Sequence, residues 1–128
     1  MNIGKLLDEI VAKKGNEECL IFEDKIFKYQ DVLEETNKYA NFFKSIGIEK
    51  GKKVGLFLQN SPEYIFSYFA IFKMGATGVP IDHRLKVNEI CTLLNHSQSE
   101  YLITYNFKDF NADEIKKNVP SIKEIILI

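Results

Sequence analysis

The chain has 128 residues, of which 45% are hydrophobic and 27% are charged. This composition is typical of a globular domain and excludes a disordered chain. A net charge of -1 offers no basic field to a phosphate backbone, so we do not expect nucleic acid as a partner.

Local patterns in the first 50 residues predict a helix, a β-hairpin and a second helix. Apolar residues recur at helical spacing over residues 3–11, and Gly15 ends that helix. Two short apolar stretches, 19–22 and 26–29, are separated by three charged residues and predict a hairpin. A second helix is expected over residues 30–45, with Gly47 as its C-terminal cap.

From residue 54 the pattern changes to a regular alternation of strands and helices. Strands are expected to start near residues 54, 77, 101 and 125, and each interval has room for one crossover helix. The run VGLFL is apolar throughout, as in a strand that is covered on both faces. The Ser61-Pro62-Glu63 sequence predicts the start of a largely apolar helix, and further helices are expected around 87–94 and over 107–119.

These elements predict an α/β fold. It consists of a mostly parallel, Rossmann-like sheet built from βαβ units with flanking helices, preceded by a helix and a β-hairpin. We expect residues 1–128 to form a single α/β fragment of a larger domain, because the last predicted strand ends at the last residue without a covering helix.

The cysteines and the apolar runs of the sequence indicate the cellular compartment of the protein. Neither Cys19 nor Cys91 lies in a metal-binding spacing, and both are expected to be buried or half-buried thiols of a reducing compartment. The N-terminal 15 residues lack the pattern of a signal peptide, and no apolar run approaches the roughly 20 residues of a membrane span. We therefore expect a cytoplasmic protein without a transmembrane segment.

Ligands of parallel sheets bind beyond the carboxyl ends of the strands, where three predicted loops lie: 59–61, 82–84 and 105–106. Arg84 and Lys86 are candidates to contact an anionic group, or they are a solvated loop residue and a helix-entry residue. Asp82 and His83 could form an acid–imidazole pair, although adjacent loop residues usually point apart. His96 is expected to lie at the surface near a helix end, and Asn60 and Ser61 to be turn and cap residues.

Several motifs of nucleotide and hydrolytic chemistry do not occur. The sequence contains no GxGxxG, no GxxxxGK[ST], no GxSxG and no HExxH. From its residues alone the chain is therefore a Rossmann-like α/β layer without a defined active site, and we expect no catalytic and no metal-binding residue in it.

Two segments resemble the core motifs of adenylate-forming enzymes. Residues 72–82, FKMGATGVPID, resemble the second core motif, and residues 27–32, FKYQDV, resemble the first. The segments IGIEKGKKV and LQNSPE lie between them, where this family has its GxxxGDxV and NxxE segments. The chain departs from the family at Lys28, which replaces a capping Thr, and at Lys52 or Lys53, which replaces an Asp.

The resemblance implies a two-step reaction in the parent enzyme. A carboxylic acid reacts with ATP to give an acyl-adenylate and pyrophosphate, and the thiolate of CoA then displaces AMP, with Mg²⁺ offsetting phosphate charge. The phosphate loop, the acyl pocket and the catalytic Lys of the family map beyond residue 128, so an isolated fragment is expected to be inactive and to bind none of these cofactors tightly. Arg84 and Lys86 are the only positions carried over, as contacts of the CoA phosphates.

Residues 82–85, DHRL, followed by Glu89, look more like the acyl-CoA synthetases, and among these most like fatty-acid–CoA ligases. One alternative is an amino-acid or aryl-acid adenylating domain that loads a carrier protein. Others are a stand-alone Rossmann-like binding module and a structural or interaction domain. An apolar surface left exposed in the fragment makes self-association an additional expectation.

Overall fold

The computed structural model describes residues 2–128, and these divide into two compact units. The first unit runs to Gly51 and resumes over Asn60–Ala76; the second comprises Lys52–Gln59 and Thr77–Ile128. The first unit holds α1 (Ile3–Lys14), β1 (Glu18–Phe22), β2 (Lys25–Lys28), α2 (Tyr29–Ser45) and α3 (Pro62–Lys73). The second holds β3 (Lys53–Phe57), β4 (Thr77–Pro80), α4 (Val87–Ser97), β5 (Tyr101–Thr104), α5 (Ala112–Asn118) and β6 (Glu124–Leu127).

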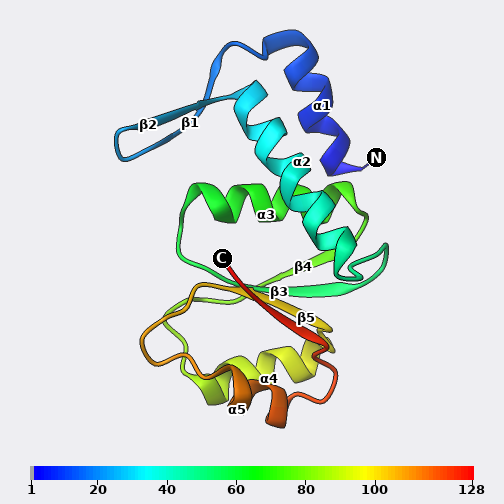
Figure 1. Ribbon diagram of the computed structural model, residues 1–128, viewed down its shortest axis with the longest axis vertical. Coiled ribbons are helices and arrows are strands. Elements are labelled where there is room, and N and C mark those ends of the chain that lie inside the picture. Colours follow the sequence, from blue (N-terminus) through cyan, green and yellow to red (C-terminus); the bar gives the residue numbers. More distant parts are fainter. Residues whose placement is uncertain (1) are drawn as a thin grey trace. The chain divides into compact units, whose positions relative to one another are not determined.

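The first unit is built on three helices that pack against one another (Figure 1). Leu7 of α1, Val32 of α2 and Phe66 of α3 are buried together at its centre. Lys73 joins the same three helices, since its Nζ lies 3.1 Å from Asp8 Oδ1 and 2.7 Å from Asn37 Oδ1. The predicted inner stripe of α1 is only partly covered: Ile3, Leu6 and Ile10 are exposed.

The end of α2 confirms the predicted glycine cap. Gly47 has a φ of 100°, which a residue without Cβ adopts without strain. Its N–H donates to the Lys44 carbonyl, and the N–H of Ile48 donates to the Phe43 carbonyl. This pair of bonds is a Schellman motif, and the side chains of Phe43 and Ile48, at the two ends of the longer bond, are both buried.

The hairpin is confirmed, with a two-residue turn at Glu23 and Asp24. Tyr29 begins α2 instead of ending β2, because Asp31 Oδ2 accepts the backbone N–H of Lys28 at 2.8 Å and so caps the helix.

The prediction of a buried or half-buried thiol is correct for Cys91 and wrong for Cys19. Cys19 is exposed because it shares the outer face of the hairpin with Ile21.

The second unit is a four-stranded, all-parallel sheet in the order β4-β3-β5-β6. Helices α4 and α5 lie against one of its faces (Figure 1). They bury a core with the sheet that includes Ile90, Leu94, Leu102 and Ile115. The run from Val54 to Leu58 is buried throughout, as its apolar sequence predicted. The predicted α/β class with a parallel sheet and a preceding hairpin is therefore confirmed.

Helix α5 is shorter than the predicted helix over 107–119. It begins at Ala112, because the side chain of Asn111 accepts the N–H of Glu114 at 3.1 Å and caps it there. Residues 107–110 instead form an irregular loop at the C-terminal end of β5.

The amino ends of the strands are joined by an ion-pair network. Glu100 Oε2 lies 3.2 Å from Lys52 Nζ and 2.9 Å from Lys123 Nζ. The two lysines lower the pKa of Glu100, with Lys123 the larger cause. Lys52, one of the two lysines that could stand at the Asp position of the resembling family, therefore has a structural partner here. Among residues 2–128, no helix has the length and apolar character needed to cross a membrane.

We predict that Gly55→Ala destabilises the protein. A Cβ at Gly55 would lie 2.7 Å from Leu94 Cδ2 and 3.1 Å from Leu102 Cδ1, both on fully buried side chains. Overpacking of this kind costs about 1–3 kcal/mol in the free energy of unfolding, measured by urea denaturation. Lys53→Ala on the same strand is the control and should change this free energy by less than about 0.5 kcal/mol, because Lys53 is exposed. Equal stability of the two variants would contradict the close packing of α4 on β3.

Candidate functional site

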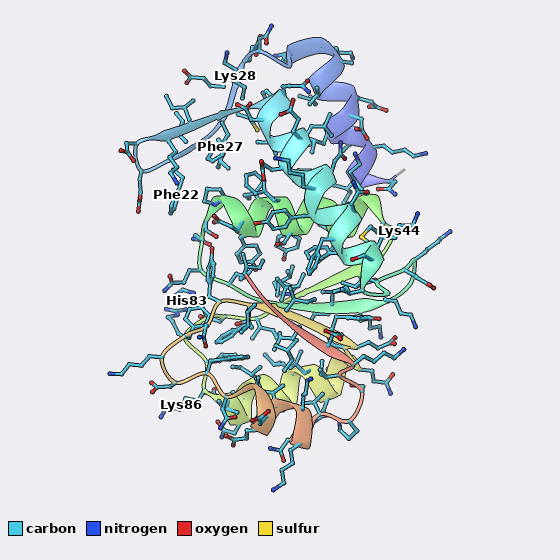
Figure 2. All side chains as sticks on the ribbon, viewed as in Figure 1. Phe22, Phe27, Lys28, Lys44, His83 and Lys86 are labelled. Carbon is cyan, nitrogen blue, oxygen red and sulfur yellow. The ribbon has the colours of Figure 1, made fainter. Side chains whose placement is uncertain are left out.

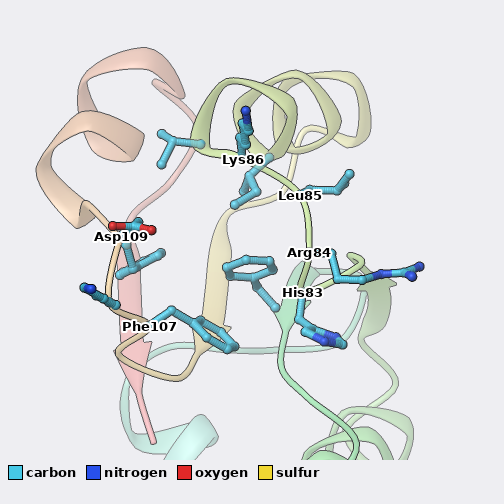
Figure 3. A pocket seen from close by; sticks show the side chains of 11 residues that line it. His83, Arg84, Leu85, Lys86, Phe107 and Asp109 are labelled. Carbon is cyan, nitrogen blue, oxygen red and sulfur yellow. The ribbon is translucent and has the colours of Figure 1, made fainter.

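A cavity of about 620 Å³ lies at the carboxyl edge of the sheet, within the second unit (Figure 3). The strand order explains it, because β4 and β5 flank β3 and the loops that follow them rise on either side of its end. The lining comes from the end of β3, from the loop and first turn between β4 and α4, and from the loop after β5: Phe57, His83, Arg84, Leu85, Lys86, Val87, Ile90, Phe107, Lys108, Asp109 and Phe110.

The loop after β4 is shaped by two carboxylates. Asp82 Oδ1 accepts the backbone N–H of Arg84 at 2.9 Å, which turns the chain sharply after the strand. Glu89 Oε1 accepts the N–H of Lys86 at 3.1 Å and caps the first turn of α4. These two bonds place His83 and Lys86 beside the cavity.

The loop after β5 supplies an aromatic wall. The rings of Phe57 and Phe107 lie 4.9 Å apart, and Phe107 also contacts Tyr105 at 5.9 Å. Phe110 completes the group, with its ring 6.4 Å from that of Phe57. These rings, together with Ile90, give the cavity an apolar interior.

Arg84 and Asp82 form a bidentate ion pair. Arg84 Nε lies 2.9 Å and Nη2 2.6 Å from the two Asp82 carboxylate oxygens. The guanidinium holds the pKa of Asp82 well below its usual range, helped by the Arg84 N–H, and the carboxylate in turn raises the pKa of Arg84. The side chain of Arg84 is 78% exposed and extends away from Phe107 and Asp109 (Figure 3). The Asp82 carboxylate thus pairs with Arg84 and does not form the acid–imidazole pair with His83.

The polar groups of the cavity are mostly cationic or neutral. Lys86 and Lys108 contribute positive charge, His83 an imidazole, and Asp109 the one carboxylate among the lining residues. An apolar interior with a basic rim suits a ligand that combines an apolar or aromatic body with an anionic group. Sequence reasoning identified Lys86 but missed Lys108 and the aromatic wall, because residues 107–110 were expected to be helical.

The other candidate residues from the sequence, Asn60, Ser61 and His96, lie outside the cavity. Ser61 caps α3, its Oγ accepting the N–H of Tyr64 at 3.3 Å. Asn60 and Ser61 line a separate groove in the first unit. His96 lies exposed in the last turn of α4. Within the described part of the chain, no group of three or more His, Cys, Asp or Glu side chains is placed to hold a metal ion.

A cavity at the carboxyl edge of a parallel α/β sheet is the usual position of the ligand site in this class of fold. Residues 7–128 match the model of the AMP-binding enzyme family, and the chain belongs to this family.

Two groups of known proteins are similar to the chain. Crotonobetaine/carnitine–CoA ligases of Salmonella typhimurium and Salmonella enteritidis are 40% identical to it over 108 residues, which are 80% of this chain and 21% of theirs. The solved anthranilate CoA ligase AuaEII, in complex with anthranoyl-AMP, is 28% identical with a TM-score of 0.91, over 100% of this chain and 25% of that one. The N-terminal domain of FACL13 from Mycobacterium tuberculosis is 25% identical with a TM-score of 0.88, over 98% of this chain and 33% of that one. The chain thus spans about a fifth of the length of these curated relatives.

We predict that Asp82 titrates below the ordinary range of aspartate because of Arg84, and that His83 adds little. Carboxyl-carbon NMR should show a low pKa for Asp82 in the unmodified chain. In Arg84→Gln this pKa should return toward the usual value of about 3.9, whereas in the control His83→Gln it should stay low. Because the folded-state pKa is depressed, the pair stabilises the loop above pH about 4 and loses this effect as the pH falls through the folded pKa. A larger rise of the pKa in His83→Gln than in Arg84→Gln would contradict this assignment.

Proposed function

We propose that residues 1–128 are the N-terminal portion of an ATP-dependent acid–CoA ligase, and that both units belong to its large N-terminal domain. The observation that carries the proposal is the family match over residues 7–128, together with 40% identity to curated acid–CoA ligases. In the reaction, a carboxylate oxygen of the acid attacks the α-phosphorus of ATP and pyrophosphate leaves. The CoA thiolate then attacks the carbonyl carbon of the acyl-adenylate, and AMP leaves with the electron pair of the broken C–O bond.

The part of this chain in that reaction is to bind and position. ATP and Mg²⁺ need a phosphate loop and oxygen ligands, and the described residues contain neither a glycine-rich phosphate motif nor a metal-binding cluster. We therefore propose that these residues take no direct part in the chemical steps and that an isolated 1–128 fragment is inactive. The cytoplasmic location stays a prediction.

The cavity at the carboxyl edge of the sheet is proposed to receive CoA. The CoA nucleotide has an aromatic ring and several phosphates, which fit the ring wall of Phe57, Phe107 and Phe110 and the basic rim. Lys86 and Lys108 line the cavity and would contact the phosphates. Arg84, the second residue carried over from the family, is paired with Asp82 and would have to exchange that carboxylate for a phosphate.

The identity of the carboxylic acid substrate is less constrained by these observations than the use of CoA. The resemblance of residues 82–85 and Glu89 to fatty-acid–CoA ligases favours a fatty acid. The curated relatives at 40% identity act, by their names, on crotonobetaine and carnitine, and AuaEII acts on anthranilate. We therefore propose a panel of carnitine-like, aryl and fatty acids, tested by acid-dependent ATP–pyrophosphate exchange and by CoA thioester formation on the full-length ligase.

The second candidate function is a domain that adenylates an aryl or amino acid and loads a carrier protein. It shares the first half-reaction, and it would give pyrophosphate exchange without a thioester of CoA. A stand-alone binding module would give neither activity, in any length of chain. Failure of exchange with every acid of the panel would refute the ligase proposal.

We predict that Lys86→Ala and Lys108→Ala raise the KM for CoA of the full-length ligase by roughly 2- to 5-fold each, since a solvent-exposed charge contact is worth up to about 1 kcal/mol. The kcat of ATP–pyrophosphate exchange should not change, because CoA takes no part in that step. Lys116→Ala on α5 removes the same charge outside the lining and is the matched control. An unchanged KM for CoA in both variants, or an equal rise in the control, would exclude the cavity as the CoA site.

A further inference from the structure

The β1–β2 hairpin exposes an apolar pair on its outer face. Ile21 and Ile26 lie directly opposite each other in the antiparallel register, and they are 63% and 55% exposed. Cross-strand isoleucines normally stabilise a sheet by burying their facing surfaces against a further layer. Within the described residues no such layer covers this face. A two-stranded sheet is marginally stable when one of its faces stays in water.

Both edges of the hairpin are also open. In the described part of the chain, β1 pairs only with β2 and β2 only with β1, so each strand has one edge of N–H and C=O groups without a neighbouring strand. Open edges accept a further extended segment through main-chain hydrogen bonds.

The inner face of the hairpin continues into a groove of about 430 Å³ against α3. Leu20 and Phe22 line it from β1, and Tyr64, Ile65 and Tyr68 line it from α3. Figure 2 shows Phe22 and Phe27 on the same side of the hairpin, and Phe27 packs edge-on against Phe66 of α3 with ring centroids 5.6 Å apart.

The groove has no charged lining residue. The rings of Tyr64 and Tyr68 are stacked 5.1 Å apart, and burial, with a contribution from the Tyr68 hydroxyl, raises the pKa of Tyr64 to about 12. Tyr64 therefore stays neutral at any physiological pH, and the groove suits an apolar occupant.

We infer that this hairpin surface seats an apolar, extended segment from the remaining part of the ligase chain. The hairpin surface is defined as Ile21 and Ile26 on the outer face together with the groove residues Leu20, Phe22, Tyr64, Ile65 and Tyr68 on the inner face. An extended segment that pairs with the open edge of β1 directs alternate side chains to the two faces, so one segment contacts both. The inference rests on the proposed function, under which residues 1–128 belong to a chain several times longer. The matching region is only 21% of the length of the curated relatives, so most of such a chain is free to supply the segment.

A segment of the same polypeptide is favoured over a second copy of the protein as the occupant of the hairpin surface. A segment of the same polypeptide docks on the hairpin in an intramolecular step, so its occupancy does not depend on protein concentration, whereas that of a second copy does. An exposed apolar pair beside two open strand edges would otherwise promote aggregation.

The test is amide hydrogen exchange of residues 18–28 and 60–68, compared between the full-length ligase and the 128-residue chain. We expect exchange in the full-length ligase to be slower by about 10-fold or more at the hairpin amides. Equal exchange in the two proteins would overturn the inference. Protection that grows with protein concentration, with a dimer in sedimentation, would also overturn it, since the occupant would then be a second copy.

A double variant separates docking from folding of the hairpin. Ile21→Thr with Ile26→Thr keeps β-branched residues in both strands while removing apolar surface. It should abolish most of the added protection in the full-length ligase and leave exchange of the 128-residue chain unchanged. Phe42→Ser, an exposed apolar residue of α2 outside the hairpin surface, is the control and should leave the protection intact. A double variant with full protection would refute the docking.

Failure of this inference and failure of the proposed function can be told apart. Hydrogen exchange reports docking without any catalytic turnover, and ATP–pyrophosphate exchange of the unmodified full-length protein reports adenylation. Protection without exchange activity would uphold the docking and reject the ligase; activity without protection would do the reverse.

Discussion

The position of β3 between β4 and β5 is the constraint on which the candidate site depends. Because the three strands are parallel, their carboxyl ends meet at one edge, and the loops after β4 and β5 face each other across the end of β3. That approach brings the basic loop residues and the phenylalanine rings into one cavity. Gly55 contributes to the geometry, since the absence of a Cβ lets α4 pack close to the strand.

The cavity combines two properties that usually compete. Apolar rings exclude water, and cations at the rim need water or an anion as partner. A ligand with an aromatic base and phosphates satisfies both, and this is the physical basis of the proposal that CoA binds here. The Asp82–Arg84 pair sets a limit on the assignment, because Arg84 already has a carboxylate in bidentate contact. Lys86 and Lys108, which lie on the two facing loops, are the more available cations.

Much of this architecture could be predicted from the sequence. Ser61-Pro62, Gly47 and the apolar run VGLFL each determine local structure through a single strong effect: a cap, a positive φ or burial on both faces. The strand order and the cavity could not be predicted, because periodicity reports which face of an element is buried and not which strand is its neighbour. The prediction of a helix over 107–119 is wrong for 107–110, because the Asn111 side chain caps α5 and sets its start at Ala112. Cys19 was misplaced because alternation in a hairpin leaves one face outward, and the sequence does not reveal which.

We propose that the cavity between the loops after β4 and β5 holds CoA. The most direct measurement is a titration of the ¹⁵N-labelled 128-residue chain with CoA to millimolar concentration, followed by backbone amide NMR shifts. The account predicts concentration-dependent shifts at residues 83–87 and 107–110, and none at 60–68 in the separate groove. Shifts confined to other residues, or no shift at any of these amides, would contradict it.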